Sequence, residues 1–570
     1  MTFEEAVHLL RRAEVGRRTF VRTPFGKRLV TYADLTATGR ALGFVDDLVA
    51  AARPLYANTH TAISTTGRTM TRLREDAREA IARSVHAADD DVVLFVGSGA
   101  TAAVNKLVGL LGLRISEPLE RAYALSARIP PGERPIVLVS PFEHHSNELP
   151  WLESVAEVVE VGLDASGRMD LADLEAKARA HADRPLRIGA FSAASNVTGL
   201  LTDVRAIARI LHAHGFVACV DYAAAGPYVP IDLHPADPAE SIEAIFVSTH
   251  KFMGGPEGSG VLVAHRSLFR SATPERPGGG TVEYVAAFDR LSVDYTPRLD
   301  EREEGGTPDI LGDIRAGLAF LVKEMVGPER ILAHEIALGA HAIERLRGHP
   351  RLMLYGPLDA PRLPILSFNV KGLHHDLVST LLDHLFGIQN RAGCSCAGPY
   401  GHRLLGIGPE RSNEYRAAIA CGMLGLKPGW VRLSLPYYAT DEEVEFLLSA
   451  VELVADHGDA FVPLYRLGLA DGLWRTAGDA PPDPDPIRMD VESVRRAAER
   501  GVPRSDPGDA IPEGAAAALR QSYLDEAGRM AAELEERWRR EPPRWEAPSG
   551  DPALDRLAWF RWVKAEGAAS

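Results

Sequence analysis

The sequence predicts an α/β protein with a largely parallel β-sheet. Short apolar segments, the expected strands, occur near residues 92–96, 136–140, 157–161, 187–192, 216–221 and 244–248. Most of them alternate with helical segments, which is typical of a parallel sheet covered by helices on both faces. Hydrophobic residues make up 46% of the 570 residues, which is sufficient for a large core.

Four regions are predicted along the chain. Residues 1–60 form an N-terminal segment that packs with the small domain, and residues 61–320 form a large domain that holds the sheet. Residues 321–456 form the smaller α+β domain, and residues 457–570 form a Pro-rich linker with a helical extension. In the smaller domain, residues 430–435 have the pattern of a strand and residues 441–454 that of a closing helix.

The C-terminal extension has two predicted parts. Residues 480–486, Ala-Pro-Pro-Asp-Pro-Asp-Pro, cannot form a helix and are expected to be a stiff, exposed linker. Beyond them, apolar residues recur every three or four positions: Leu519, Tyr523, Ala527, Met530, Leu534 and Trp538. Such a helical stripe most often docks on its own protein. The alternative is that this tail, with Trp545 and the aromatic cluster at 559–562, covers an active-site mouth or recruits a partner.

Charge and composition exclude several classes of protein. The formal charge of −15 at pH 7 argues against a general nucleic-acid binder and against binding to anionic membranes. No apolar run approaches the length of a membrane span, and residues 1–8 contain early acids without a signal-peptide core, so we expect a cytoplasmic protein. Four cysteines fit a reducing compartment and not a disulfide scaffold.

Lys251 is the first candidate catalytic residue. It follows the apolar segment 244–248, stands beside His250 and precedes a glycine turn. A lysine at a partly buried strand end has a lowered pKa, and its amine can then hold an aldehyde as a Schiff base. A His-Lys pair alone is usually a surface feature, so this hypothesis depends on the neighbouring motifs.

Two further motifs follow strands at the same predicted sheet edge. Asp221 ends the segment 217–221, where a carboxylate can keep a pyridine nitrogen protonated, although such an aspartate is often only a helix cap. The sequence Glu-His-His-Ser-Asn at 143–147 follows the segment 136–140. One of its imidazoles can stack on a ring and move protons, whereas a histidine pair that caps a helix is the plainer interpretation.

A glycine-rich turn forms a candidate anion site. Residues 97–101, Gly-Ser-Gly-Ala-Thr, link the segment 92–96 to an apolar helix predicted at 102–111. Free amides and a hydroxyl at a helix N-terminus suit a phosphate group. The motif is weak by itself, because glycines before helices are common in α/β proteins.

Together these motifs resemble those of the fold-type I pyridoxal-phosphate enzymes of aminotransferase class V, and within that class the cysteine desulfurases of the sulfur-mobilising type. The resemblance covers roughly residues 30–455 and includes further segments at 32–34, 56–60, 150–151, 195–199, 305–308 and 391–396. It implies a large domain with a mostly parallel sheet, a smaller α+β domain, and pyridoxal 5′-phosphate as the cofactor.

The resemblance also implies roles for single residues. Lys251 holds the cofactor as a Schiff base, Asp221 pairs with the pyridinium, and His144 stacks on the ring, with His145 as the less favoured stacker. Further cofactor contacts are expected from Ser248, His250, Thr101, Asn196 and the backbone of Ala100, which replaces a threonine. Thr307, in a Gly-Thr-Pro turn, reaches the phosphate of the neighbouring subunit, which implies a homodimer.

The segment 391–396 determines the expected activity. Arg391 has a planar guanidinium that can bind an amino-acid carboxylate through two hydrogen bonds, and Cys396 follows five residues later in a loop rich in glycine and proline. In the family that it resembles, this cysteine attacks the sulfur of L-cysteine and keeps it as a persulfide for a sulfur-acceptor protein, while L-alanine is released. Nearby arginine and histidine favour the required thiolate.

Other interpretations of Cys396 are a small buried residue or half of a zinc-binding pair with Cys394. Zinc is disfavoured because a structural site needs four ligands and Cys219 and Cys421 lack a matching spacing, so no metal site is expected. Cys394 is a second sulfur-accepting thiol, a disulfide partner of Cys396 or a passive small residue, and the passive role is favoured.

Ala224 departs from the family pattern. Many class V desulfurases have glutamine three residues after the aspartate that pairs with the pyridinium, and Ala224 cannot make the same hydrogen bond. A carbon–sulfur lyase, aminotransferase or epimerase acting on another amino acid, with a non-catalytic Cys396, is therefore the alternative enzyme. A cofactor-binding scaffold without turnover is the alternative from a different class.

Overall fold

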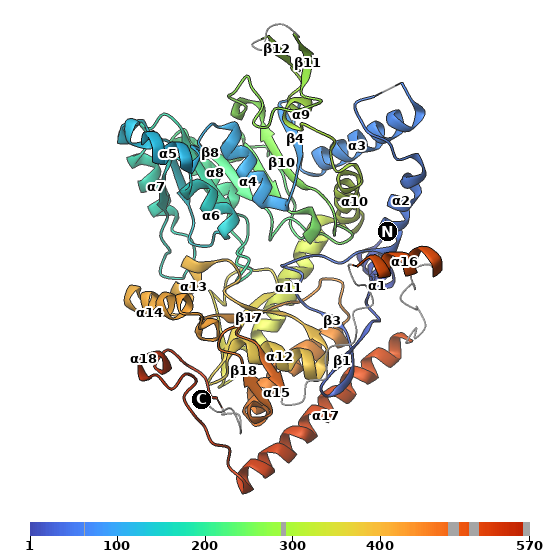
Figure 1. Cartoon of the computed structure of the whole chain (residues 1–570), viewed down its shortest axis with the longest axis vertical. Coiled ribbons are helices and arrows are strands. Elements are labelled where there is room, and N and C mark those ends of the chain that lie inside the picture. The colour runs from blue at the N-terminus through green and yellow to red at the C-terminus, as the bar shows by residue number, and fades with distance from the viewer. Residues whose placement is uncertain (62, 287–291, 477–489, 501–511, 563–570) are drawn as a thin grey trace.

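The computed structural model describes residues 1–61, 63–286, 292–476, 490–500 and 512–562. A large domain holds a seven-stranded sheet of order β4-β10-β9-β8-β7-β5-β6. The small domain and the long helix α17 lie at the other end of the molecule (Figure 1). The strands of the large sheet are β4 (Asp91–Val96), β5 (Ile136–Val139), β6 (Glu157–Glu160), β7 (Arg187–Ser192), β8 (Val217–Asp221), β9 (Ala244–Val247) and β10 (Gly260–His265).

All neighbouring strands of this sheet are parallel except β10, which is antiparallel to both β4 and β9. The six expected strands are present, and the α/β fold class with a mostly parallel sheet is confirmed; β10 was not anticipated. Successive residues of β9 face opposite cores, with Ala244 and Phe246 on one side and Ile245 and Val247 on the other. Burial on both faces explains why the strand is a continuous apolar run.

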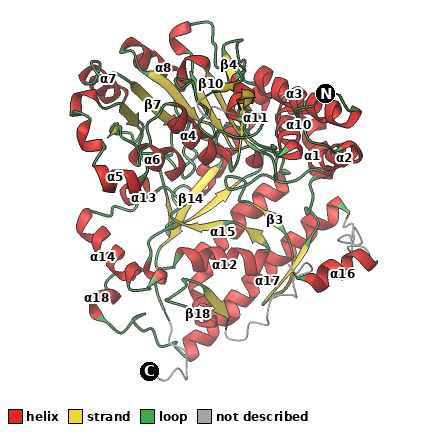
Figure 2. Cartoon of the chain, turned by 45° about the horizontal axis from the view of Figure 1, so that its top comes forward, coloured by secondary structure: helices red, strands yellow, loops and turns green. Residues whose placement is uncertain are grey.

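Helices cover both faces of the sheet (Figure 2). One face packs against α4 and the tryptophan of α6, and the other packs against α3, α7, α8 and α10. Their bounds are α3 (Thr65–Ser84), α4 (Gly99–Leu110), α6 (His145–Leu152), α7 (Leu171–Ala180), α8 (Val204–Ala213) and α10 (Ile310–Val326). The C-terminal ends of the parallel strands therefore open toward the small domain between two helical layers, which is where ligands bind in such sheets.

The small domain contains a four-stranded antiparallel sheet of order β13-β14-β17-β16 packed against two long helices. Its elements, after the connecting helix α11 (Pro328–Leu346), are β13 (Leu352–Leu354), β14 (Ile365–Val370), α12 (His375–Phe386), β16 (Arg391–Gly393), β17 (Trp430–Ser434) and α15 (Asp441–Phe461). A capping box of Thr440 and Glu443 begins α15. This helix extends beyond the expected residue 454 because Ala455, Ala460 and Phe461 are also buried.

The N-terminal segment contacts both domains. Helices α1 (Phe3–Ala13) and α2 (Gly43–Ala52) pack against α10 of the large domain. Between them, β1 (Phe20–Thr23) and β2 (Gly26–Leu29) form a hairpin beside α12, and β3 (Thr31–Tyr32) pairs in parallel with β15 (Ile388–Gln389) of the small domain. Residues 31–42 therefore cross from one domain to the other.

The apolar stripe of the extension docks on the small domain. Helix α17 (Glu513–Arg540) packs along α15, and Tyr523, Ala527 and Ala531 are buried in the contact. Farther on, Trp559 stacks on His375 with ring centroids 5.7 Å apart, and Phe560 is buried in the same core. The expected linker at 480–486 lies outside the described residues.

The other described helices are α5 (Glu117–Tyr123), α9 (Leu299–Glu303), α13 (Gly398–Leu404), α14 (Pro409–Ala420), α16 (Val491–Arg500) and α18 (Pro552–Asp555). The other strands are β11 (Val282–Val285), β12 (Val293–Tyr295), β18 (Tyr465–Leu467) and β19 (Trp474–Thr476). Among the helices of the described ranges, none combines the length and the apolar composition that a membrane span requires.

A pair of substitutions on α17 tests its docking. Ala531 is fully buried, whereas its neighbour Ala532 is exposed. We expect Ala531→Asp to lower the free energy of unfolding by about 2–4 kcal/mol, because it places an unpaired carboxylate in an apolar contact. Ala532→Asp makes the same change in helix propensity at an exposed position, so it should change the free energy of unfolding by less than about 1 kcal/mol. Chemical denaturation measures both; equal effects would contradict the docked arrangement.

Candidate active site

A cavity of about 230 Å³ lies where the strand ends of the large domain meet the small domain. It is lined by ten of the residues selected from the sequence: Ala100, Thr101, His144, Asn196, Asp221, Ser248, His250, Lys251, Arg391 and Cys396. Thr307 is not among the lining residues; its hydroxyl accepts a hydrogen bond from Asn58 Nδ2 at 3.3 Å on the exposed surface. The fold thus gathers in one place side chains that are up to 296 positions apart, from Ala100 to Cys396.

Lys251 lies in a short turn that follows β9. Burial, opposed by the charge of Asp221 and helped by the charges of Arg432 and Arg391, lowers the pKa of its amine to about 8. Asp221, at the end of β8, is itself buried, which raises the pKa of its carboxyl group. Its Oδ1 accepts a hydrogen bond of 2.7 Å from the Ala223 amide. About a tenth of Lys251 is therefore neutral, and nucleophilic, at pH 7, and about half at pH 8.

The two adjacent histidines have different positions. His144 lines the cavity and is also the N-cap of α6, where its Nδ1 accepts a hydrogen bond of 3.1 Å from the Ser146 amide. The same imidazole ring therefore both caps α6 and lines the cavity. Burial, reinforced by the charge of Lys251, lowers the pKa of His144 to about 4. Its imidazole is neutral at neutral pH and carries its proton on Nε2, because Nδ1 is an acceptor.

His145 does not line the cavity but holds the cysteine loop. Its Nε2 accepts a hydrogen bond of 3.1 Å from the Gly398 amide, and its own amide donates to the carbonyl of Cys396 at 2.9 Å. Asn196 Nδ2 donates to the carbonyl of Ser395 at 2.8 Å. The loop is therefore fixed to the large domain on both sides of Cys396.

The cysteine loop has an unusual backbone. Ser395 and Cys396 both adopt left-handed conformations, with φ of 48° and 54°, which cost non-glycine residues of order 1 kcal/mol each. The resulting turn directs Cys396, an exposed residue, to the cavity. Cys394 is partly buried against the apolar cluster around Tyr400 and Trp430. Only one of the two loop cysteines faces the site.

The glycine turn before α4 is closely packed against Ser248. Gly99 has φ of 57°, and a Cβ atom there would lie 2.6 Å from Ser248 Oγ. The Ala100 amide donates to that hydroxyl at 2.9 Å, while Thr101 Oγ1 lies 2.6 Å from Ser146 Oγ. Hydroxyls and amides at a helix N-terminus thus form one end of the cavity, an arrangement that suits an anionic group.

Two arginines occupy the small-domain side of the cavity. Arg391 on β16 pairs in register with Arg432 on β17, and the carboxylate of Asp34 accepts from Arg391 Nε at 3.2 Å and from Arg432 Nη2 at 2.9 Å. The Arg391 side chain is 49% exposed and that of Arg432 only 4%. Arg432 Nε is buried without a partner among the described residues. This second arginine was missed because residues 430–435 were interpreted only as a strand; a charge within an apolar run was the available clue.

The described residues contain one cluster with metal-type ligands, His374, His375 and Asp376, at the start of α12. Both ring nitrogens of His374 are engaged with the backbone, Nδ1 by the Asp376 amide at 3.1 Å and Nε2 by the Gly425 carbonyl at 3.0 Å. Burial keeps the pKa of both histidines well below its ordinary value. The pair serves as an N-cap and a stacking surface for Trp559.

The fold and the cavity define an α/β enzyme whose reactive amine and acidic partner stand at the ends of adjacent parallel strands. The family model described as Aminotransferase class-V matches residues 31–447. The chain belongs to this family, whose members are pyridoxal-phosphate-dependent enzymes.

Three proteins similar to this chain are named for the same activity. A "Probable cysteine desulfurase" of Halalkalibacterium halodurans is 30% identical over 65% of this chain and 88% of its own length. A cysteine desulfurase of Pectobacterium atrosepticum is 29% identical over 73% of this chain and 94% of its own. The apo structure of the cysteine desulfurase of Thermococcus onnurineus has a TM-score of 0.60 at 26% identity and covers 75% of this chain and 95% of its own. Each match leaves at least a quarter of this chain uncovered.

The lowered pKa of Lys251 can be tested directly. We expect acylation of Lys251 in the cofactor-free protein to titrate near pH 8, below the value of about 10.4 typical of lysine, because burial destabilises the ammonium form. Asp221→Asn removes a charge that stabilises this form, so the midpoint should fall further. Pulse labelling with acetic anhydride and peptide mass spectrometry measure the rate, with the exposed Lys371 as the internal reference. An unshifted midpoint would refute the assignment.

Proposed function

We propose that this protein is a pyridoxal-phosphate-dependent cysteine desulfurase, which converts L-cysteine to L-alanine and retains the sulfur as a persulfide on Cys396. The observation that carries the proposal is the position of Cys396 in the same cavity as Lys251 and the two arginines. The cysteine desulfurase relatives support it. Because all four cysteines are free and the chemistry needs a reduced thiol, we place the reaction in the cytoplasm.

The residues that line the cavity fit pyridoxal phosphate in three respects. Lys251 has a nucleophilic amine for the aldehyde, buried Asp221 has a carboxylate for the pyridinium, and the N-terminus of α4 with Ser248 has donors for the phosphate. When bound, this group supplies an electron sink for the carbon atoms next to the amine of the substrate.

Lys251 and the neutral His144 are the proposed proton carriers. The lowered pKa leaves part of Lys251 unprotonated, so its Nζ can take the α proton of the substrate and later return a proton. His144 lies beside it with a pKa near 4 and a proton on Nε2, which can be donated and regained. Near neutral pH, His144 is therefore neutral, and the neutral fraction of Lys251 increases as the pH rises toward 8.

Arg432 and Arg391 are the proposed binding residues for the substrate carboxylate. A guanidinium presents parallel donors that match a carboxylate, and desolvation strengthens this pair. Arg432 is nearly buried and Asp34 fixes its orientation, so we expect it to bind more strongly than the half-exposed Arg391. This extends the sequence hypothesis, which had assigned the role to Arg391 alone.

Cys396 is the proposed sulfur acceptor. Its thiolate attacks the sulfur of the bound L-cysteine, a sulfur–sulfur bond forms, and the carbon–sulfur bond breaks with its electron pair moving to the β carbon. Protonation of that carbon gives the methyl group of L-alanine. The persulfide sulfur then passes to the thiol of an acceptor, for which the exposed position of Cys396 gives access.

Thr307 supports a homodimer in this proposal. It does not line the cavity of its own chain, and its hydroxyl accepts a hydrogen bond from Asn58 on the surface. We propose that it serves the phosphate site of a second copy of the chain, as the family pattern implies.

A second candidate keeps the cofactor and makes Cys396 a spectator. Ala224 lines the cavity at a position where a glutamine amide is expected, and its methyl group cannot make the hydrogen bond that the amide would make to the cofactor. A carbon–sulfur lyase, aminotransferase or epimerase that acts on another amino acid would fit this observation.

The two loop cysteines form a matched test of the activity. We expect wild-type protein with L-cysteine and a reductant to release alanine and sulfide in equal amounts. Cys396→Ser should lower this turnover by on the order of 10³-fold, because the nucleophile is lost, while cofactor absorbance is retained. Cys394→Ser should have a small effect, since Cys394 packs in an apolar cluster. Full turnover by Cys396→Ser would favour the second candidate.

Lysine substitutions compare the two arginines. We expect Arg432→Lys to raise KM for L-cysteine by about 10- to 100-fold, because a buried bidentate hydrogen-bonded pair is lost while the charge is kept. Arg391→Lys should raise it by less than about tenfold, because this side chain is half exposed. Steady-state alanine production measures both variants; the reverse order would show that Arg391 is the main carboxylate-binding residue.

A further inference from the structure

The C-terminal helix α17 holds the strand segment that leads into the active site. Tyr523 Oη accepts a hydrogen bond of 3.2 Å from the Leu29 amide, and Arg520 Nε donates to Thr31 Oγ1 at 3.2 Å. Arg28 donates to Glu526 Oε2 at 3.0 Å and lies over the ring of Tyr523. Helix α17 thus contacts three of the four residues from Arg28 to Thr31.

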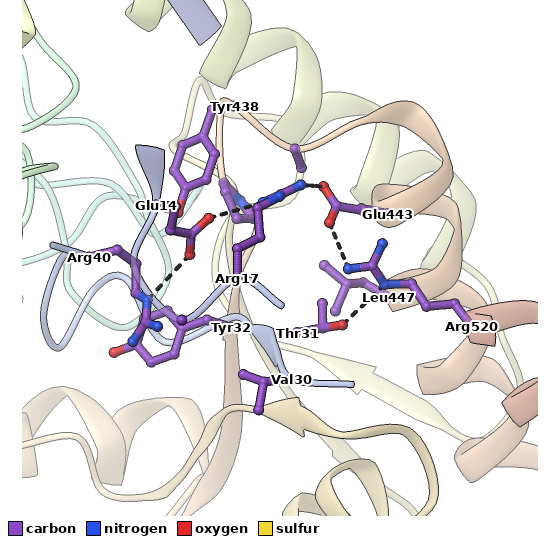
Figure 3. A pocket seen from close by; sticks show the side chains of 13 residues that line it. Glu14, Arg17, Val30, Thr31, Tyr32, Arg40, Tyr438, Glu443, Leu447 and Arg520 are labelled. Carbon is purple, nitrogen blue, oxygen red and sulfur yellow. Dashed lines mark hydrogen bonds and ion pairs between the residues drawn. The ribbon is translucent and has the colours of Figure 1, made fainter. Parts of the chain in front are cut away.

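Arg520 also begins a chain of charged residues in which Arg520 and Glu443 are buried and the others are half-buried (Figure 3). Its Nη2 lies 2.7 Å from Glu443 Oε1, Glu443 pairs with Arg17, Arg17 pairs with Glu14 at 3.0 Å, and Glu14 pairs with Arg40 at 3.3 Å. These residues enclose a small cavity of about 20 Å³ beside Tyr32. Charges alternate in sign along the chain, so each buried group has a partner.

Residues 31–40 lead from the contact with α17 to the small-domain side and to the large-domain side of the active site. Asp34 accepts hydrogen bonds from Arg391 and Arg432. The Gly39 amide and Thr38 Oγ1 both donate to the carbonyl of His250, at 2.8 and 3.1 Å, next to Lys251. One continuous segment therefore links α17 to the substrate-binding arginines and to the lysine turn.

We propose that the C-terminal extension is a positioning element of the active site, in which Arg520 and Tyr523 hold residues 28–32 and thereby set the position of Asp34 and of the arginines it orients. This inference rests on the proposed function for its effect on substrate binding. None of the described extension residues lines the active-site cavity, so the effect is indirect. The family match ends at residue 447, so α17 lies outside the part of the chain that the family model matches.

The test uses the full-length holoenzyme with three variants. Arg520→Met removes the contact with Thr31 but leaves Glu443 paired with Arg17. Tyr523→Phe removes only the acceptor of the Leu29 amide. Trp538→Phe is the matched control: it removes the hydrogen bond of 2.8 Å from α17 to the Ala460 carbonyl, a docking contact at the other end of the helix.

Two readouts separate positioning from docking. We expect Arg520→Met and Tyr523→Phe to raise KM for L-cysteine by roughly 2- to 30-fold with a smaller change in kcat, the range typical of residues that act through a coupled network. The amides of Thr31 and Ala33, which bond to Gly387 and Gln389, should exchange hydrogen faster in both variants. Trp538→Phe should lower stability while KM and these exchange rates stay unchanged.

Other outcomes overturn the inference. Unchanged KM and unchanged exchange in both test variants would show that α17 only docks. Equal KM increases in the control would show a general loss of stability. A wild-type enzyme that makes no alanine from L-cysteine would reject the proposed function, and the exchange rates of Thr31 and Ala33 would then decide whether α17 fixes this segment.

Discussion

The carboxylate of Asp34 is the contact on which the arrangement of the active site depends. It bridges Arg391 and Arg432, two cations on adjacent strands that face the amine of Lys251. Like charges a few ångströms apart repel by several kcal/mol in partly buried surroundings. With Asp34 between them the guanidinium groups keep one orientation, and the cavity retains the positive character that an anionic ligand needs.

The cavity exists only where the two domains meet. The amine, the acid and the anion-binding helix end belong to the large domain, whereas the arginines and the thiol belong to the small domain. His145 and Asn196 cross this junction to hold the backbone around Cys396. A shift of one domain against the other would thus separate the nucleophile from the amine without altering either group. Such a shift would lower the catalytic rate, because catalysis requires the reacting groups to be almost in contact.

Sequence reasoning succeeded where the information is local. The parallel strands were predictable because burial on both faces makes each one a continuous apolar run. The location of Lys251, Asp221 and His144 at one edge of the sheet was predictable because each ends or follows such a strand, whereas their roles stay predictions. The antiparallel strand β10 was missed because residues 248–259, which join it to β9, form a loop with one 3-10 turn in place of the expected α-helix. Two tertiary contacts could not be predicted from a local pattern. Asp34 pairs with Arg432, 398 positions away, and His145 accepts a hydrogen bond from the Gly398 amide.

Contacts between the two ends of the chain have a consequence for biosynthesis. Arg28 and Glu526 are 498 positions apart, and Leu29 and Tyr523 are 494 apart. At a translation rate of about 5–20 residues per second, the hairpin waits roughly 25–100 s before its partner helix leaves the ribosome. During that interval its edge is uncovered, and such edges favour wrong pairing. The contacts between α17 and the hairpin therefore form well after the hairpin itself has been synthesised.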